Sequence, residues 1–269
     1  MFKHNARFRP AVSASARASV VYLTYLLRGC RTQARADPEN RMLFRQLFDA
    51  ESSTYTYLLA GQAGGEGLLI DPVQGQTPLY LELLAELGLQ LVIALDTHTH
   101  ADHITALGDL RNATACVTLM GEHTRAECVS ARFRDGEAVA CDGVSLRALY
   151  TPGHTDESFS LVGADRVFTG DALLIRGTGR TDFQNGDPHQ AYDSIFNKLL
   201  RLPDETLVYP AHDYRGCTVS TIGEERQFNP RLQVGSAQDY ARLMNGLRLP
   251  SPKLMDVAVP ANLRCGRAL

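Results

Sequence analysis

A dense cluster of metal-binding side chains occurs in one stretch of the sequence, which reads Asp-Thr-His-Thr-His-Ala-Asp-His. Its histidines are His98, His100 and His103, and its aspartates are Asp96 and Asp102. Imidazole and carboxylate ligands together suit zinc or iron better than calcium or magnesium, which prefer oxygen ligands. Because the stretch directly follows an apolar run that is typical of a buried strand, it predicts a metal site at the end of that strand.

Three further imidazole or carboxylate groups follow other apolar runs: His154 in Thr-Pro-Gly-His, Asp171 in Thr-Gly-Asp and His212 in Tyr-Pro-Ala-His. Each lies where a predicted strand gives way to a turn with Pro or Gly, so we expect all three to join the first cluster. Spacing alone leaves open whether the site holds one metal ion or two. A zinc pair would divide the side chains into two sets: His98, His100 and His154 on one ion, Asp102, His103 and His212 on the other, and Asp171 between them.

The elements that must position these groups are predicted from the spacing of apolar residues, which indicates a mixed α/β fold from residue 41 onward. Predicted strands cover residues 42–48, 54–59, 67–70, 91–95, 115–119, 144–150, 158–163, 166–169 and 206–209. Predicted helices cover residues 78–87, 188–202 and 236–247. The strands 158–163 and 166–169 are close enough in sequence to form a hairpin. Since no internal repeat or linker interrupts residues 41–269, we expect one domain there.

Composition and charge exclude several classes of protein. The 269 residues are 44% hydrophobic and 21% charged, which is ordinary for a soluble globular protein, and no apolar run is long enough to span a membrane. Residues 1–40 contain seven basic and two acidic residues, so the overall charge of −3 leaves −8 for residues 41–269. An acidic domain of this kind argues against nucleic acid as a partner.

Residues 1–40 differ from the rest of the chain. No acidic residue precedes Asp37, and Arg, Ala and Ser recur around an apolar stretch at residues 18–27. This composition predicts a mitochondrial presequence and hence a location in the mitochondrial matrix. The alternative is a bacterial cytoplasmic protein whose true start is Met42.

The cysteines carry no recognisable motif, because none of them forms a Cys-x-x-Cys pair. The sequence therefore predicts neither a zinc knuckle nor a dithiol redox site, and a reducing compartment is the simpler interpretation. We expect each cysteine to behave as a small buried hydrophobic residue without chemistry. The six are Cys30, Cys116, Cys128, Cys141, Cys217 and Cys265.

The order His-x-His-x-Asp-His, then His, Asp and His, resembles the metallo-β-lactamase fold superfamily over residues 42 to about 220. The resemblance implies an αββα sandwich with its metal site along one edge of two packed sheets. Five other stretches are similar to the persulfide dioxygenases, also called sulfur dioxygenases, of mitochondria and bacteria. They are Arg-Gln-Leu-Phe-Asp from Arg45, Thr-Tyr-Thr-Tyr-Leu-Leu from Thr54, Gly-Asp-Ala-Leu-Leu-Ile-Arg-Gly-Thr-Gly-Arg-Thr-Asp-Phe from Gly170, Tyr-Pro-Ala-His-Asp-Tyr-Arg-Gly from Tyr209 and Val-Pro-Ala-Asn-Leu-Arg-Cys-Gly from Val259.

This resemblance implies an oxidoreductase of sulfide oxidation that uses O2 to convert glutathione persulfide to sulfite and glutathione. It implies one ferrous ion held by His98, His154 and Asp171, a triad that leaves about three coordination positions open for substrate and oxygen. The neighbouring groups would then orient the ligands and bound water through hydrogen bonds. These neighbours are His100, Asp102, His103 and His212.

Glutathione carries two carboxylates, so its site requires groups such as guanidinium that pair with a carboxylate in two-pronged fashion. We expect Arg180, Tyr214 and Arg264 to supply these contacts, because they lie in the stretches that resemble the family. The alternative for Arg180 is a structural salt bridge with Asp182 or Asp187.

Two other functions are compatible with the same ligands. A glyoxalase II-like hydrolase would cleave a glutathione thioester with a metal pair, but only 57 residues follow His212, fewer than that family's helical extension requires. A non-catalytic iron or glutathione sensor is the alternative of another class. A homodimer is compatible with the sequence, and any sulfurtransferase or sulfide-oxidising partner is expected to be a separate chain.

Overall fold

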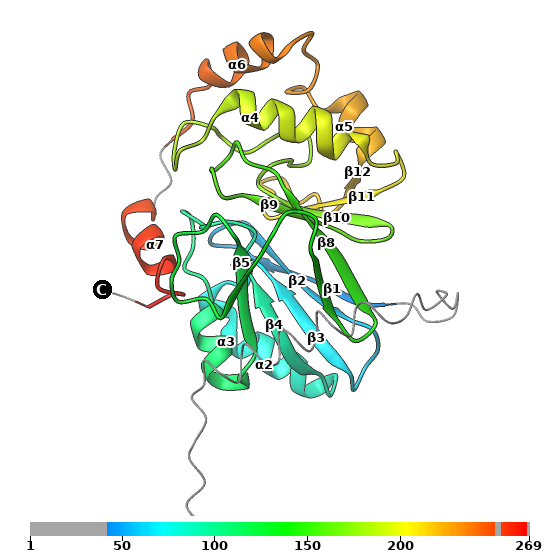
Figure 1. The fold of residues 1–269 in the computed structure, drawn as a ribbon, viewed down its shortest axis with the longest axis vertical. Helices are drawn as coiled ribbons and strands as arrows, with labels where there is room; N and C mark the ends of the chain where they lie inside the picture. Colours follow the sequence, from blue (N-terminus) through cyan, green and yellow to red (C-terminus); the bar gives the residue numbers. More distant parts are fainter. Residues whose placement is uncertain (1–41, 251–253, 268–269) are drawn as a thin grey trace, which may run out of the picture.

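The computed structural model describes residues 42–250 and 254–267, so the predicted leader at residues 1–40 lies outside the described part. Two six-stranded sheets pack face to face, with helices on the outer face of each (Figure 1). This is the αββα sandwich that the resemblance implied. None of the helices in the described residues is long and apolar enough to cross a membrane.

The first sheet has its strands in the order of the sequence: β1 (Leu43–Asp49), β2 (Thr54–Ala60), β3 (Glu66–Ile70), β4 (Gln90–Leu95), β5 (Val117–Gly121) and β6 (Ala131–Phe133). β1, β2 and β3 are antiparallel, whereas β3 to β6 run parallel to one another. Parallel neighbours need crossover connections. The short η1 (Gln74–Gln76) with α2 (Thr77–Glu86) connects β3 to β4, and α3 (Leu107–Thr114) connects β4 to β5.

The second sheet has the order β12-β11-β10-β9-β8-β7. Its strands are β7 (Ala138–Cys141), β8 (Val144–Tyr150), β9 (Phe159–Val162), β10 (Arg166–Gly170), β11 (Leu207–Pro210) and β12 (Ser220–Thr221). β9 and β10 form the predicted antiparallel hairpin, and β10 pairs parallel to β11. The helical segments of this half of the chain are α4 (Pro188–Tyr192), η2 (Asp193–Lys198), η3 (Leu199–Arg201), α5 (Ile222–Phe228), α6 (Ala237–Asn245) and α7 (Met255–Asn262).

The predicted elements are confirmed with small shifts at their ends, and several short elements were not predicted. The strand predicted at 144–150 has those bounds, while the helix predicted at 188–202 is built from consecutive α, π and 3-10 turns. The missed elements are the strands β6, β7 and β12, the short turn η1 and the helices α3, α5 and α7. All of them are eight residues or shorter, too short for a periodic apolar pattern to emerge.

Aromatic rings fill the space between the two sheets. Tyr57 from β2 lies against Phe168 from β10, with ring centroids 4.9 Å apart, and the Tyr57 hydroxyl donates to the carbonyl of Pro210 at 2.6 Å. Phe44 and Tyr209 extend the cluster, with their centroids 4.9 Å apart. The rings therefore fix how the two sheets face each other, and with them the edge where the predicted ligands meet.

The structure contradicts part of the cysteine prediction. Cys116 and Cys141 are buried and unpaired as expected, but Cys217 is exposed. Cys128 and Cys265 form a disulfide, which the sequence analysis did not predict. The prediction failed because the two residues are 137 positions apart and only the folding of the C-terminal segment brings their Cα atoms to 5.9 Å.

We predict that Phe168→Ala lowers the free energy of unfolding by about 3 to 5 kcal/mol, because it leaves a cavity between the sheets that neighbouring rings cannot fill. Phe168 is 1% exposed. Val257→Ala is the control, since Val257 is 59% exposed and its loss is expected to change stability by about 0.5 kcal/mol or less. Urea denaturation followed by circular dichroism measures both, and equal stability of the two variants would contradict the assignment of the core.

Candidate metal centre

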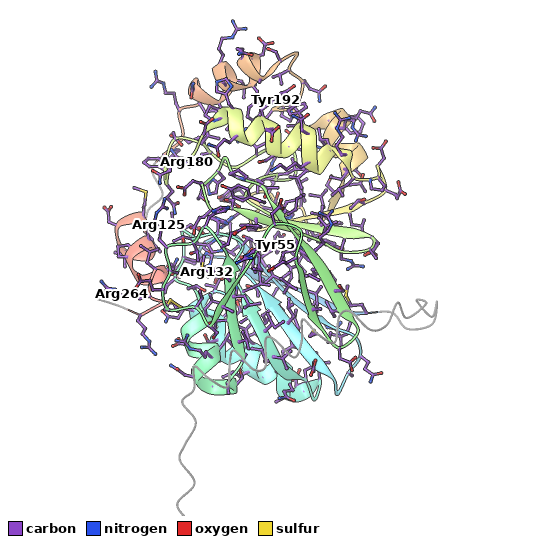
Figure 2. The ribbon with its side chains drawn as sticks, in the orientation of Figure 1. Tyr55, Arg125, Arg132, Arg180, Tyr192 and Arg264 are labelled. Atoms are coloured by element: carbon purple, nitrogen blue, oxygen red, sulfur yellow. A yellow bond between two sulfur atoms is a disulfide. The ribbon has the colours of Figure 1, made fainter. Side chains whose placement is uncertain are left out.

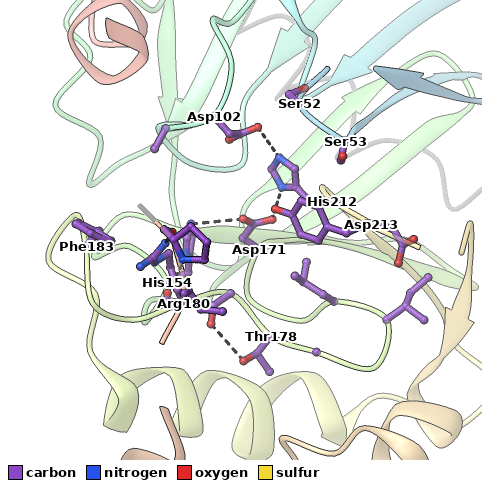
Figure 3. A pocket seen from close by; sticks show the side chains of 18 of the residues that line it. Ser52, Ser53, Asp102, His154, Asp171, Thr178, Arg180, Phe183, His212 and Asp213 are labelled. Atoms are coloured by element: carbon purple, nitrogen blue, oxygen red, sulfur yellow. Dashed lines mark hydrogen bonds and ion pairs between the residues drawn. The ribbon is translucent and has the colours of Figure 1, made fainter. Parts of the chain in front are cut away.

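The loops that follow β4, β8, β10 and β11 meet at one edge of the sandwich and bring the seven predicted metal-site residues together. The structure places them in two sets, and within each set the candidate ligand atoms all lie within 4.8 Å of one another. Figure 3 shows the side chains that border the adjoining cavity, among them His154, Asp171 and His212. The sets are His98, His154 and Asp171, and beside them His100, Asp102, His103 and His212.

The first set has free donor atoms aimed at one point. Nδ1 of His154 donates to the carbonyl of Arg180 at 2.8 Å, which leaves its Nε2 free and 3.5 Å from Oδ2 of Asp171. Nδ1 of His98 is bonded to Oγ1 of Thr97 at 3.0 Å, so its Nε2 is also free. A neutral imidazole that is bonded through one nitrogen and open at the other is the usual state of a metal-binding histidine. This donor set fits a transition-metal ion.

His212 is engaged through both ring nitrogens. Nδ1 lies 2.7 Å from Oδ1 of Asp171, and Nε2 lies 2.7 Å from Oδ2 of Asp102. Burial alone would lower the pKa of His212, but the two carboxylates outweigh burial and hold its pKa well above the usual value. Burial likewise would raise the pKa of Asp171, but the neighbouring histidines, His212 foremost, hold it low. His212 therefore lies between the two carboxylates and orients Asp171 through a hydrogen bond.

His100 and His103 each keep one buried nitrogen without a hydrogen-bond partner in the described residues, Nδ1 and Nε2 respectively. The other nitrogen of His103 lies 3.0 Å from Asp102, and that of His100 lies 3.1 Å from Asp71. The two unpaired atoms would serve a bound water or a second ion. A second ion would also need Asp102 and His212, which are already bonded to each other.

Asp71 is a functional residue that the sequence analysis missed. It follows β3 with φ +51 and is 1% exposed. Its carboxylate accepts from the backbone N–H and the hydroxyl of Thr97, at 2.7 and 3.0 Å, and contacts His100. Since the Thr97 hydroxyl also bonds His98, Asp71 orients the loop and one ligand at once. Its signal in the sequence is an aspartate directly after an apolar strand that neighbours β4.

A cavity of about 780 Å³ opens beside His154 and Asp171. Two of the three predicted glutathione contacts border it, Arg180 and Tyr214. Tyr214 is 72% exposed and its ring is nearly parallel to that of His212. Arg264 is exposed on the far side of the C-terminal segment and does not border the cavity (Figure 2).

Arg180 is held by its own loop. It makes a two-pronged salt bridge with Asp182, at 2.7 and 2.9 Å, and donates to the carbonyl of Pro250 at 2.6 Å. Its guanidinium also lies over the ring of Phe183. The structure therefore contains the salt bridge that the sequence analysis gave as the alternative for Arg180, with Asp182 and not Asp187 as the partner.

Two other arginines at the cavity have no carboxylate partner among the described residues. Among the described residues, the guanidinium of Arg231 contacts only the carbonyl and hydroxyl of Thr178, and that of Arg215 contacts only the backbone carbonyls of Ile175 and Arg176. Both border the cavity. Burial lowers the pKa of Arg231, as expected of a cation without a compensating charge. The sequence analysis singled out neither of them. Arg215 lies in the stretch from Tyr209 that resembles the family, whereas Arg231 lies in no recognised motif.

Comparisons with known proteins agree with this geometry. The profile of the Metallo-beta-lactamase superfamily matches residues 50–212. The human protein named persulfide dioxygenase ETHE1, mitochondrial, is 45% identical over 84% of this chain and 89% of its own length, and the mouse protein of the same name is 44% identical over the same shares. The crystal structure of ETHE1 from Myxococcus xanthus superposes with a TM-score of 0.82 at 52% identity, over 84% of this chain and all of that one. The chain therefore belongs to the persulfide dioxygenase family of the metallo-beta-lactamase superfamily.

Proposed function

We propose that the protein is a glutathione persulfide dioxygenase that uses O2 to form sulfite and glutathione. The observation that carries the proposal is the triad of two histidines and one aspartate whose free donor atoms converge beside a cavity. His98, His154 and Asp171 would hold a single ferrous ion. When bound, such an ion supplies redox chemistry and open positions at which a sulfur ligand and oxygen can meet.

A single ion, not a pair, is favoured by the position of His212. Because His212 bonds Asp171 on one side and Asp102 on the other, it orients the aspartate and competes with any second ion for both carboxylates. The same contacts argue against the glyoxalase II-like alternative, which needs a metal pair to make its hydroxide. The non-catalytic sensor is addressed by the experiment that follows.

We expect protein purified without added metal to contain about one iron and little zinc per chain, and to consume O2 when glutathione persulfide is supplied. Elemental analysis and an oxygen electrode, applied to one preparation, measure both. Two zinc ions with thioesterase activity and no oxygen uptake would establish the hydrolase instead. Iron binding with no turnover of either substrate would establish the sensor.

A matched pair of variants separates the role of Asp171 as a proposed metal ligand from the role of His212 as the residue that orients it. Asp171→Ala removes a proposed ligand and is expected to abolish iron binding and activity together. His212→Ala removes only the hydrogen bonds that orient Asp171, so we expect it to keep most of the iron and to lose activity roughly 10- to 100-fold. Iron content and oxygen uptake are compared at equal protein concentration. Equal loss of metal in both variants would support a second metal site that includes His212.

The substrate's carboxylates are assigned to Arg231 and Arg215, with Tyr214 beside the metal centre. The two arginines border the cavity without an acidic partner, whereas Arg180 already pairs with Asp182 and Arg264 lies elsewhere. Arg231 is half-buried, so a carboxylate that arrives with the ligand would pair with it partly shielded from water, whereas Arg215 is exposed. We therefore place the charged end of glutathione at Arg231 and its persulfide at the triad.

We predict that Arg231→Lys raises the Michaelis constant for glutathione persulfide roughly ten- to a hundred-fold with little change in turnover, since lysine keeps the charge but loses the two-pronged contact. Arg242→Lys is the matched control, because Arg242 pairs with Asp239 on the exposed surface of α6 and does not border the cavity. Steady-state oxygen uptake gives both constants. An unchanged Michaelis constant in Arg231→Lys would remove this residue from the substrate site.

We also propose that the protein acts in the mitochondrial matrix. The composition of residues 1–40 supports this location, and the human and mouse relatives are named mitochondrial. The alternative, a bacterial cytoplasmic protein that starts at Met42, has support in the similarity to the Myxococcus xanthus protein. The homodimer and the separate sulfurtransferase stay predictions.

A further inference from the structure

The disulfide between Cys128 and Cys265 joins two segments near the loop that follows β4. This loop, residues 96–105, is called the metal loop below. Cys128 lies in the connection from β5 to β6, and Cys265 directly follows α7 at the C-terminal end of the chain. Cys265 is 1% exposed, whereas Cys128 is only partly buried. Neither sulfur belongs to the metal site or borders the cavity, so the proposed reaction gives this bond no role.

The C-terminal segment that the disulfide anchors is hydrogen-bonded to the backbone of the metal loop. The side chain of Asn262, in the last turn of α7, donates to the carbonyls of His100 and His103, each at 2.8 Å. Its oxygen accepts from the backbone N–H of Thr105 at 2.9 Å. Asn262 is 3% exposed, so these three bonds form away from water. One side chain therefore fixes the backbone of the loop that carries four of the seven metal-site residues.

The backbone of the C-terminal segment packs so closely on its neighbours that the segment cannot shift without losing these contacts. The carbonyl of Cys265 accepts from the N–H of Gly108 at 3.0 Å, and a Cβ atom on Gly108 would lie 2.4 Å from that oxygen. A Cβ atom on Gly266 would lie 2.1 Å from the carbonyl of Thr105. If the segment moves, the bonds of Asn262 are therefore lost together and not one by one.

The helix α7 itself adds little hydrophobic contact to the hold on the segment. α7 buries mainly the small side chains of Ala258 and Ala261, while Leu254 and Val257 are 39% and 59% exposed. Small buried side chains contribute little hydrophobic stabilisation. The covalent bond at Cys265 therefore supplies a large share of what keeps the segment in place, because it removes the freedom of the detached chain.

We propose that the Cys128–Cys265 disulfide is a thiol-sensitive lock on the metal loop. Closed, it keeps Asn262 bonded to the loop; opened by a small thiol such as glutathione, it lets the segment detach and the metal leave faster. The proposal rests on the metal site and holds whatever substrate the enzyme takes. An enzyme that releases glutathione would in this way meet, in its own product, the reductant that loosens its metal centre.

The chemistry is a pair of thiol–disulfide exchanges. A thiolate attacks the sulfur of Cys128, the less buried residue of the pair, the bond to Cys265 breaks, and Cys265 leaves as a thiolate that takes up a proton. A second thiolate attacks the outer sulfur of the mixed disulfide and releases Cys128. The protein disulfide gains two electrons, and two thiols become one small-molecule disulfide.

The test compares metal-loaded full-length protein in buffers of different ratios of glutathione to glutathione disulfide. Alkylation followed by peptide mass spectrometry reports the state of Cys128 and Cys265, and transfer of the metal to a coloured chelator reports its rate of release. Hydrogen exchange of the backbone amides of residues 98–105 reports the loop itself. We expect reduction to speed metal release roughly tenfold and to raise exchange in the loop, in step with alkylation of the two cysteines.

Cys128→Ser should release metal at the reduced rate in every buffer, whereas Cys217→Ser, at an exposed unpaired cysteine, should keep the response of the natural sequence. Asn262→Ala should release metal fast even with the disulfide intact. Reduction of the bond without change in metal release, or a Cys128→Ser variant as slow as the oxidised protein, would overturn the lock. None of these readouts needs oxygen uptake, so they stand apart from the test of the proposed activity.

Discussion

The hydrogen-bonded chain Asp102–His212–Asp171 is the interaction on which the site depends. Asp102 belongs to the loop after β4 in one sheet, while Asp171 and His212 follow β10 and β11 in the other, so the chain spans the two layers. A buried histidine that is bonded to two carboxylates keeps its position only while both partners stay in place. The relative position of the sheets, set by the aromatic rings between them, is therefore also the condition for a correctly placed Asp171.

Glycines allow the backbone to come close enough for this arrangement. A Cβ atom on Gly179 would lie 2.2 Å from the carbonyl of Asp171 and 2.8 Å from Nδ1 of His154, so no other residue fits between two of the proposed ligands. Gly153, with φ +137, packs directly on Ala191 of α4 and so places the turn that carries His154. Both lie in the stretches that resemble the family, where the chain turns sharply after a strand.

Charge pairing explains how the loops around the cavity can be stable while the cavity still offers cations to an anionic ligand. Two of the four arginines that border the cavity, Arg176 and Arg180, are paired with acidic residues within the protein, and so they support loops without attracting a ligand. The other two, Arg215 and Arg231, have no carboxylate partner for the guanidinium among the described residues, so an anionic ligand is stabilised most by binding beside them. Arg180, one of three residues expected from the sequence to contact glutathione, is likewise paired within the protein, with Asp182.

The sequence by itself determined the chemistry and the framework. The cluster from Asp96 to His103, together with His154, Asp171 and His212 after predicted strands, was enough to predict a metal site at a strand edge, because ligand type and strand alternation are local properties. Tertiary structure decided which groups are free to act. Which carboxylates His212 bonds, whether Arg180 or Arg231 lacks a partner, and whether Cys128 meets Cys265 depend on residues distant in the chain, and no local pattern encodes those contacts.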